Sequence, residues 1–155
     1  MDEMSHIDER GRARMVDVSA KEATPRRAVA EAVVRLSPAV AEAVIDGGLP
    51  KGDAVAVVRV AAILGAKRTP DLIPLCHPIT LDAISVDIEV AEGGVRIVVE
   101  VVTTGPTGVE MEAMTGAAIG AVTLYDMVKG LDRGTELGPV RLLAKSGGKS
   151  GSWQR

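Results

Sequence analysis

The stretch ISVDIEVAEGGVRIVVEV, residues 84–101, decides the fold class of this sequence. Apolar residues alternate with polar or opposite-face residues over 84–90 and again over 95–101, which is the period of a half-buried strand. Glu92, Gly93 and Gly94 lie between the two runs and supply the turn. The stretch therefore predicts a β-hairpin.

The chain before the hairpin alternates between strand and helix patterns. Residues 28–36 alternate small apolar residues with charged ones and predict a half-buried strand. Residues 37–38, Ser-Pro, then begin a short helix, and the glycines at 47–48 end it. Asp53 is the expected N-cap of a second helix that runs to about residue 66.

A long helix and a last strand are expected after the hairpin. Apolar residues recur at helical spacing and should face the core: Ala117, Ala121, Leu124, Val128 and Leu131. Residues 140–144 predict the last strand, and residues 13–18 predict a further strand near the start. Strand patterns interleaved with helices and joined by one hairpin predict an α+β fold, a mostly antiparallel sheet with helices packed on one face.

Length and composition fit one domain, residues 1–155, with no nucleic-acid partner. Residues 1–14 are a polar arm of a kind that is often mobile, and residues 146–155 are a Gly- and Ser-rich tail. The sequence has no Phe, one Trp and one Tyr, so it cannot build the aromatic platform on which single-stranded nucleic acids stack. Its net charge of -3 also argues against a general polyanion binder.

Cysteine and histidine usage limits the metal and redox chemistry of one chain. Cys76 is the only cysteine and His6 and His77 are the only histidines, which excludes a disulfide framework and a structural zinc site within one chain. The longest uncharged stretch, residues 113–125, is well short of the roughly 20 residues of a membrane-spanning helix. Residues 1–14 lack the apolar core of a signal peptide. We therefore expect a cytoplasmic protein without a membrane partner.

Asp126 and Lys129 lie one turn apart on the second face of the long helix. An exposed pair of this kind is an ordinary surface ion pair, worth roughly a few tenths of a kcal/mol. Ile119 and Val122 share this face, which favours a partner surface that covers it. A covered carboxylate beside an ammonium group is a candidate proton-transfer pair, and the residues alone leave both interpretations open.

Residues 69–78 contain three prolines, at 70, 74 and 78, and should be irregular or form at most one helical turn. His77 in this segment is either a loop histidine held by local hydrogen bonds or a ligand-binding group. Cys76 is favoured as a small buried hydrophobe, because no base or metal partner is indicated. Glu110 and Glu112 enter the long helix near its N-terminus, where the helix dipole favours carboxylates in any case.

The segment 139–155 indicates an anion site. It has no acidic residue, and its basic residues are Arg141, Lys145, Lys149 and Arg155. The sequence Gly-Lys-Ser at 148–150 is similar to the end of a Walker A loop, but Leu143 replaces the required glycine, so a P-loop is excluded. The glycines at 147–148 still let backbone N–H groups approach a phosphate. A flexible, solvated tail is the alternative.

Taken together, long segments of the sequence resemble the MoaC family. They are HIDERGRARMVDVSAKEATPR (6–26), KGDAVAVVRVAAILGAKRTPDLIPLCHPI (51–79), TGVEMEAMTGAAIGAVTLYDMVKGL (107–131) and GPVRLLAKSGGKSG (138–151). The resemblance covers almost the whole chain, and strings such as DLIPLCHP and LLAKSGGKSG are uncommon.

The resemblance implies an α+β ferredoxin-like fold and a homohexamer, a trimer of dimers with active sites at subunit interfaces. It implies a lyase that forms cyclic pyranopterin monophosphate in molybdenum cofactor biosynthesis. The substrate would be the small-molecule triphosphate 3',8-cyclo-7,8-dihydroguanosine 5'-triphosphate, and diphosphate would be released. No metal and no organic cofactor is implied as necessary.

The resemblance also implies roles for individual residues. The catalytic residues would be Asp126, Lys129 and Lys51, which would act in acid/base steps. A substrate-binding group would be formed by Leu75, Cys76, His77, Met111 and Glu112, with Glu112 accepting hydrogen bonds from a guanine-like N–H edge. The triphosphate would be held by Arg26, His77, Lys145 and Lys149.

A protein of another class, a non-catalytic ferredoxin-like module that binds nucleotides or RNA through the basic tail, is the rival interpretation. The sequence lacks the stacking aromatic residues and the net positive charge that such a module needs. This interpretation is therefore disfavoured. It also leaves the carboxylate and lysine on a mostly apolar helix face unexplained.

Overall fold

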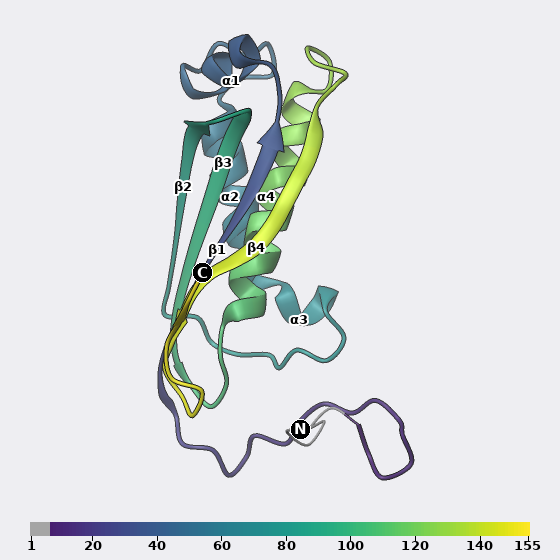
Figure 1. Cartoon of the computed structure of the whole chain (residues 1–155), viewed down its shortest axis with the longest axis vertical. Helices are drawn as coiled ribbons and strands as arrows, with labels where there is room; N and C mark the ends of the chain where they lie inside the picture. Colours follow the sequence, from purple (N-terminus) through teal and green to yellow (C-terminus); the bar gives the residue numbers. More distant parts are fainter. Residues whose placement is uncertain (1–6) are drawn as a thin grey trace.

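The sheet of this protein is antiparallel throughout the part of the chain that the structure describes. The computed structural model describes residues 7–155. Its strands are β1 (Thr24–Arg35), β2 (Ala83–Ala91), β3 (Gly94–Gly105), β4 (Glu136–Ser146) and β5 (Trp153–Gln154). They lie in the order β2-β3-β1-β4-β5 (Figure 1). The predicted hairpin is confirmed as β2 and β3, with Ala91 opposite Gly94.

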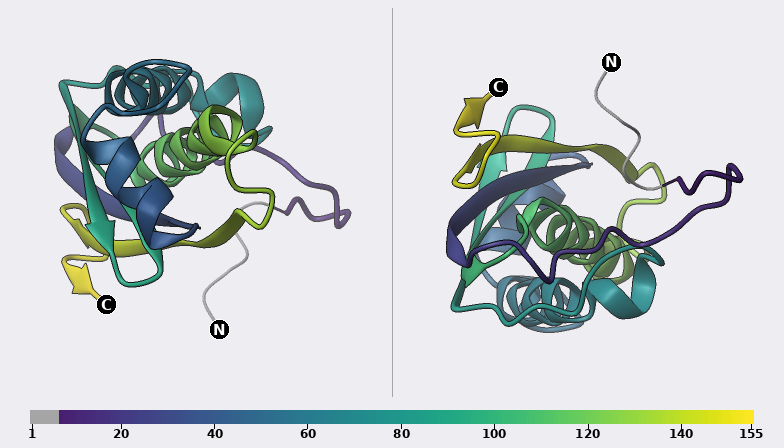
Figure 2. Two further views of the ribbon diagram at one scale, coloured as in Figure 1. Left: turned by 90° about the horizontal axis from the view of Figure 1, so that it is seen from above. Right: turned by 90° about the horizontal axis from the view of Figure 1, so that it is seen from below.

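The helices lie on one face of this sheet (Figure 2). They are α1 (Pro38–Ile45), α2 (Ala54–Lys67), α3 (Thr69–Leu72) and α4 (Glu110–Val128). Helix α4 packs against β1, β3 and β4, and α2 packs beside α4 and against β2. One strand, a helical segment, two strands, a helix and a strand make the ferredoxin-like arrangement, to which β5 is added. The α+β prediction is confirmed.

The helices α1 and α2 begin at the residues that the local sequence signals predict. Pro38 occupies the first turn of α1, where its missing N–H group is not needed. The side chain of Asp53 caps α2 by accepting a hydrogen bond from the backbone N–H of Ala56 at 2.9 Å. Helix α3 is a single turn within the proline-rich residues 69–78, as predicted.

Small residues bring α2 and α4 into close contact. The inward face of β1 consists of fully buried small and branched residues: Ala28, Ala30, Ala32 and Val34. A Cβ atom added to Gly65 of α2 would lie 2.8 Å from Cβ of Ile119 in α4. A Cβ atom added to Gly116 would lie 3.0 Å from the carbonyl oxygen of Ala62. This core has no Phe, and it reaches tight packing through the close approach of backbones.

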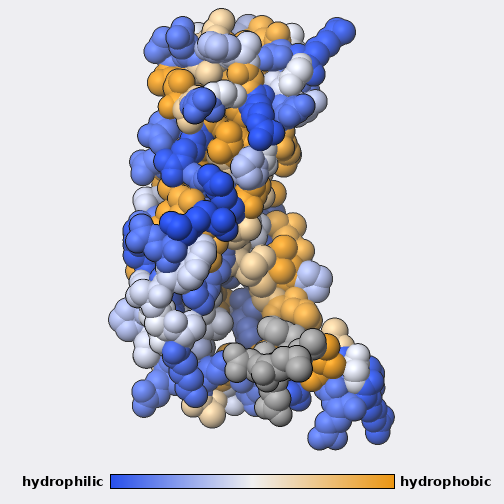
Figure 3. All heavy atoms as spheres, viewed as in Figure 1, coloured by the Kyte–Doolittle hydropathy of each residue, from blue (hydrophilic) through white to orange (hydrophobic). Residues whose placement is uncertain are grey.

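The other face of the sheet carries charged side chains. Glu31 is buried there and accepts hydrogen bonds from Arg96 and from Arg141. Burial alone would raise the pKa of Glu31, but these two hydrogen bonds outweigh it and lower the pKa. Figure 3 shows the face seen in Figure 1 as largely hydrophilic, with smaller apolar areas between the polar ones.

Some expectations about the ends of the chain are wrong. Residues 13–18 do not form a strand; Ala13 pairs only with Ile7, in an isolated bridge, and Val16 and Val18 line a cavity instead. Leu131 is half exposed and not in the core, because α4 ends at Val128. Of the polar arm 1–14, residues 1–6 lie outside the described residues. Strand β5 was not predicted, because two residues carry no periodic pattern.

Candidate active site

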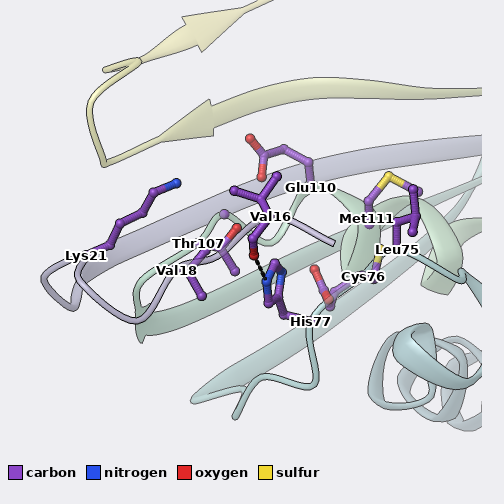
Figure 4. Close-up of a pocket in the computed structure, with 11 residues that line it drawn as sticks. Val16, Val18, Lys21, Leu75, Cys76, His77, Thr107, Glu110 and Met111 are labelled. Carbon is purple, nitrogen blue, oxygen red and sulfur yellow. Dashed lines mark hydrogen bonds between the residues drawn. The ribbon is translucent and has the colours of Figure 1, made fainter. Parts of the chain in front are cut away.

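A cavity of about 360 Å³ lies where residues 16–21 cross the start of α4 (Figure 4). The predicted substrate-binding group lines it: Leu75, Cys76, His77, Met111 and Glu112. His77 Nε2 lies 2.7 Å from the carbonyl oxygen of Val16, and Figure 4 shows this contact as a dashed line. Because Val16 is far from His77 in sequence, the ring is held by tertiary structure and not by local hydrogen bonds.

Glu112 is the buried acid of this cavity, with 3% of its surface exposed. Burial raises the pKa of Glu112 to about 7, and the negative charge of Glu110 acts in the same direction. Burial, and then the charge of Glu112, also raises the pKa of the Cys76 thiol. Glu112 can therefore accept or donate a proton near neutral pH, whereas Cys76 stays a thiol and is not an activated nucleophile.

A larger cavity of about 800 Å³ adjoins the first, and Lys21, Thr107 and Gly108 line both. The predicted anion-binding residues Arg26 and Lys149 line the larger cavity. Nε of Arg26 is buried and has no hydrogen-bond partner among residues 7–155. Three cationic side chains around one cavity suit a ligand that carries phosphate groups.

The predicted anion-binding residue Lys145 lines neither cavity but contacts one lining residue of each. Its Nζ atom is 3.0 Å from Glu110 Oε1 and 3.0 Å from Ser150 Oγ. Glu110 lines the smaller cavity and Ser150 lines the larger one. The structure thus places Lys145 next to both, in β4, which extends through Ser146.

The predicted catalytic residues form a separate cluster at the C-terminal end of α4. Asp126 Oδ1 lies 2.7 Å from Lys129 Nζ, and Asp126 Oδ2 lies 3.1 Å from Lys51 Nζ. Lys51 also donates a hydrogen bond to the backbone oxygen of Asp126. Hydrogen bonds from Lys129 and then from Lys51 lower the pKa of Asp126, and the hydrogen bond to Asp126 raises the pKa of Lys129. The cluster therefore holds a carboxylate and an ammonium group at neutral pH.

This cluster and the cavities lie at opposite ends of α4. Glu112 is in the first turn of the helix and Asp126 is in its last turn. At a rise of 1.5 Å per residue, they are separated by about 21 Å along the helix axis. Within one chain, the structure brings Lys51, Asp126 and Lys129 together, but it does not bring them to the residues of the cavities. The side chain of Asp126 is 58% exposed in the single chain.

Lys21 is a site residue that the sequence patterns did not reveal. It belongs to the segment before β1, and Figure 4 shows it at the opposite end of the smaller cavity from Leu75 and Met111. A single lysine in a polar segment has no local signature. Only its place beside both cavities makes it a candidate ligand-binding group.

The fold and the two cavities define a ferredoxin-like α+β protein with a cationic cavity that suits a small anionic ligand. Residues 15–148 match the MoaC family. A cyclic pyranopterin monophosphate synthase of Streptomyces avermitilis is 53% identical over 154 residues, which cover 99% of this chain and 91% of the relative. A protein of the same name from Corynebacterium efficiens is 52% identical over 153 residues, with 99% of each chain covered. One from Roseiflexus sp. is 50% identical over 155 residues, covering 99% of this chain and 98% of the relative.

The chain belongs to the MoaC family. The match includes every residue that lines the smaller cavity, the whole of α4, and the residues that line the larger cavity except Lys149 and Ser150. In addition, no helix within residues 7–155 combines the length and apolar character needed to cross a membrane.

Proposed function

We propose that this chain is a cyclic pyranopterin monophosphate synthase of molybdenum cofactor biosynthesis. It converts 3',8-cyclo-7,8-dihydroguanosine 5'-triphosphate to cyclic pyranopterin monophosphate and diphosphate. About half of its residues are identical to those of relatives with this name, over nearly its full length. The structural observation that carries the proposal is the pair of adjoining cavities, one with a buried acid and the other with Lys21, Arg26 and Lys149.

Each cavity binds a different part of the substrate. The guanine-derived ring lies in the smaller cavity, where Glu112 faces its N–H edge. The triphosphate lies in the larger cavity, where Arg26 and Lys149 hold it and stabilise the charge of the leaving diphosphate. Lys21 lines both cavities and thus meets the phosphate nearest the ribose, the one that the cyclic product retains.

Asp126, Lys129 and Lys51 supply the acid/base steps. Opening the purine-derived ring and closing the pyrazine ring require protons to be delivered and removed in turn. Lys129 is an ammonium group in contact with Asp126, and in the proposed mechanism it is the proton donor. Asp126 is a carboxylate in contact with both lysines, and in the proposed mechanism it orients them and accepts a proton.

The active site is completed by a second copy of the chain. A ligand in the two cavities extends from the start of α4 toward β1 and residues 148–150, away from Asp126. A two-fold axis across the middle of α4 would place the Asp126 cluster of one subunit at the cavities of the other. This operation completes both sites at once. We infer a dimer of this kind and, from the resemblance to the family, a hexamer built as a trimer of such dimers.

The outer surface of α2 and α4 supports this dimer. It exposes apolar side chains along the length of both helices: Val57, Val60, Leu64, Met111, Val122 and Tyr125. Apolar rows of this kind are typical of protein interfaces. Burial in the dimer would also remove the Asp126 cluster from solvent.

The function is tested by incubating the protein with the cyclised GTP derivative and measuring diphosphate. We expect stoichiometric release of diphosphate with formation of the cyclic product. No diphosphate release by the folded wild-type oligomer would contradict the proposed function.

The shared site is tested by coexpressing two inactive variants, Asp126→Asn and His77→Ala. If the sites lie between subunits, each mixed dimer regains one intact site, so the mixture recovers about a quarter of the wild-type activity. If each chain holds its own site, the mixture stays inactive. Sedimentation of the wild type is the second readout, and a monomer at micromolar concentration would rule out the shared site.

A cytoplasmic location completes the proposal. The free thiol of Cys76 in the smaller cavity suits a reducing compartment. Fractionation of cells that produce the protein tests this assignment.

A further inference from the structure

The loop of residues 147–152, between β4 and β5, forms one wall of the larger cavity. Gly148, Lys149 and Ser150 line this cavity. The loop lies directly on Arg26, since a Cβ atom added to Gly148 would lie 1.6 Å from a terminal nitrogen of the Arg26 guanidinium. The position of the loop therefore decides where Lys149 can meet a phosphate.

The loop is intrinsically adaptable. Gly147, Gly148 and Gly151 all have positive φ angles, of 97°, 72° and 65°. Glycine loses more conformational entropy on ordering than any other residue. A loop of this composition needs contacts beyond its own backbone to keep one conformation.

Residues 153–155 provide these contacts. In β5, Gln154 pairs with Ala144 and Trp153 pairs with Lys145 of β4. The backbone N–H of Arg155 donates to the carbonyl oxygen of Leu143 at 2.9 Å. Both ends of the loop are thereby fastened to the same strand.

The Arg155 side chain fastens this segment a second time. Its Nε atom donates to the carbonyl oxygen of Leu142 at 2.9 Å. Its guanidinium group lies over the indole ring of Trp153, at 5.6 Å from the ring centroid. Both side chains are exposed and lie outside the core, so their contacts act on the loop and not on the fold.

We propose that Trp153 and Arg155 are positioning residues that hold the loop 147–152 against Arg26 and so preorganise Lys149 for the phosphates of the substrate. The proposal rests on the proposed function for the identity of the ligand. Without the contacts of Trp153 and Arg155 with β4, which we call the tether, only a fraction of molecules have the loop in place. The apparent affinity for the phosphates then falls in proportion to that fraction. The chemical steps at the Asp126 cluster are not affected.

The test uses Trp153→Ala and Arg155→Ala in the full-length chain. We expect KM for the cyclised GTP derivative to rise about 10-fold or more, with kcat unchanged. The Kd of inorganic diphosphate, measured by calorimetry, should rise by a similar factor. The conservative variant Arg155→Lys should recover less of the wild-type KM and diphosphate affinity than Trp153→Phe does. The reason is that only a guanidinium group combines the Nε hydrogen bond with stacking on the indole ring.

Arg35→Ala is the matched control. Arg35 is an exposed arginine at the end of β1 remote from the loop, and its contact with Glu136 is long, at 3.6 Å. Its KM, kcat and diphosphate affinity should equal those of the wild type. The melting temperature and oligomeric state of every variant should also stay unchanged.

Unchanged KM and unchanged diphosphate affinity in Trp153→Ala and Arg155→Ala would overturn the proposal. So would a loss of oligomer or a large drop in melting temperature, because it would assign these residues a structural role. Failure of the proposed function gives a different result. In that case the wild type itself releases no diphosphate from the substrate, while diphosphate binding still reports on the tether.

Discussion

Lys51 Nζ lies 3.1 Å from Asp126 Oδ2, so the loop before α2 and the C-terminal end of α4 meet at one carboxylate. Lys129 approaches the other oxygen of the same group at 2.7 Å. Two ammonium groups on one exposed carboxylate are more than helix stability requires, since an exposed pair contributes under about 1 kcal/mol. In the proposed function, this arrangement serves as the proton-transfer cluster.

Asp126→Asn removes the charge and the proton-accepting ability of this group and keeps its size. We expect turnover to fall by roughly 100-fold or more, with substrate binding and the oligomer preserved. Steady-state kinetics measures turnover and substrate binding, and sedimentation measures the oligomeric state. Asp87→Asn, on an exposed aspartate of β2, is the control and should be fully active. An Asp126→Asn protein that keeps most of its rate would show that this cluster is only a surface ion pair.

The substitution Glu112→Gln should make the unfolding free energy of the protein less dependent on pH. The pKa of Glu112 is raised from 4.5 to about 7, so the folded state holds the proton more tightly than the unfolded state. The cost of ionising this buried group is absent below pH 4.5, grows as the pH rises, and is complete above about pH 7. The variant should match the wild type at pH 4.5 and exceed its unfolding free energy at pH 8, by on the order of 3 kcal/mol at most.

Denaturant unfolding at the two pH values measures this difference. Glu92→Gln, in the exposed turn of the hairpin, controls for the loss of a surface charge and should show no such pH dependence. Equal stability of Glu112→Gln and the wild type at pH 8 would mean that Glu112 is not destabilised by burial.

Lys21→Met and Lys149→Met should separate the two phosphate positions. Lys21 lines both cavities and Lys149 lines only the larger one. We expect Lys21→Met to weaken binding of the cyclic monophosphate product and Lys149→Met to weaken binding of inorganic diphosphate, each by about 10-fold or more. Calorimetry with the two ligands tests this assignment, and the reverse pattern would exclude it.

Glu31→Ala should lower stability without lowering kcat. It leaves Arg96 and Arg141 without their shared carboxylate, and because both arginines are partly exposed we expect a loss of about 1 to 3 kcal/mol. The folded-state pKa of Glu31 is lowered, so its contribution is present above pH 4.5 and is lost as the pH falls further. Glu89→Ala, which removes an exposed partner of Arg96, should cost less than about 1 kcal/mol. Equal losses for the two variants would contradict this account.

Much of the fold follows from local sequence patterns. The alternation in residues 84–101, the cap at Asp53 and the prolines of 69–78 each act within a few residues, and the hairpin, α2 and α3 lie where these signals predict. The strand predicted for residues 13–18 is absent because tertiary contacts override the local pattern. Their alternation is suited to a strand, but in the fold Val16 and Val18 turn to the smaller cavity.

The site was less accessible to sequence reasoning, because its contacts join distant parts of the chain. The hydrogen bond between His77 and Val16 and the contact between Lys51 and Asp126 span 61 and 75 residues. No spacing rule reaches so far. The resemblance to the MoaC family indicated His77, Lys51 and Asp126 but not Val16, and it did not indicate that α4 separates Glu112 from Asp126 within one chain.

The close fit of Gly65 against Ile119 fixes α4 along its middle, between the two groups of site residues. In the proposed dimer, the length of α4 therefore sets the distance between the Asp126 cluster and the cavities of the same chain, which belong to two different active sites. One residue inserted near Ile119 would rotate one end of the helix by about 100° relative to the other and lengthen it by about 1.5 Å. In the proposed two-fold dimer the same error would fall on both sites at once.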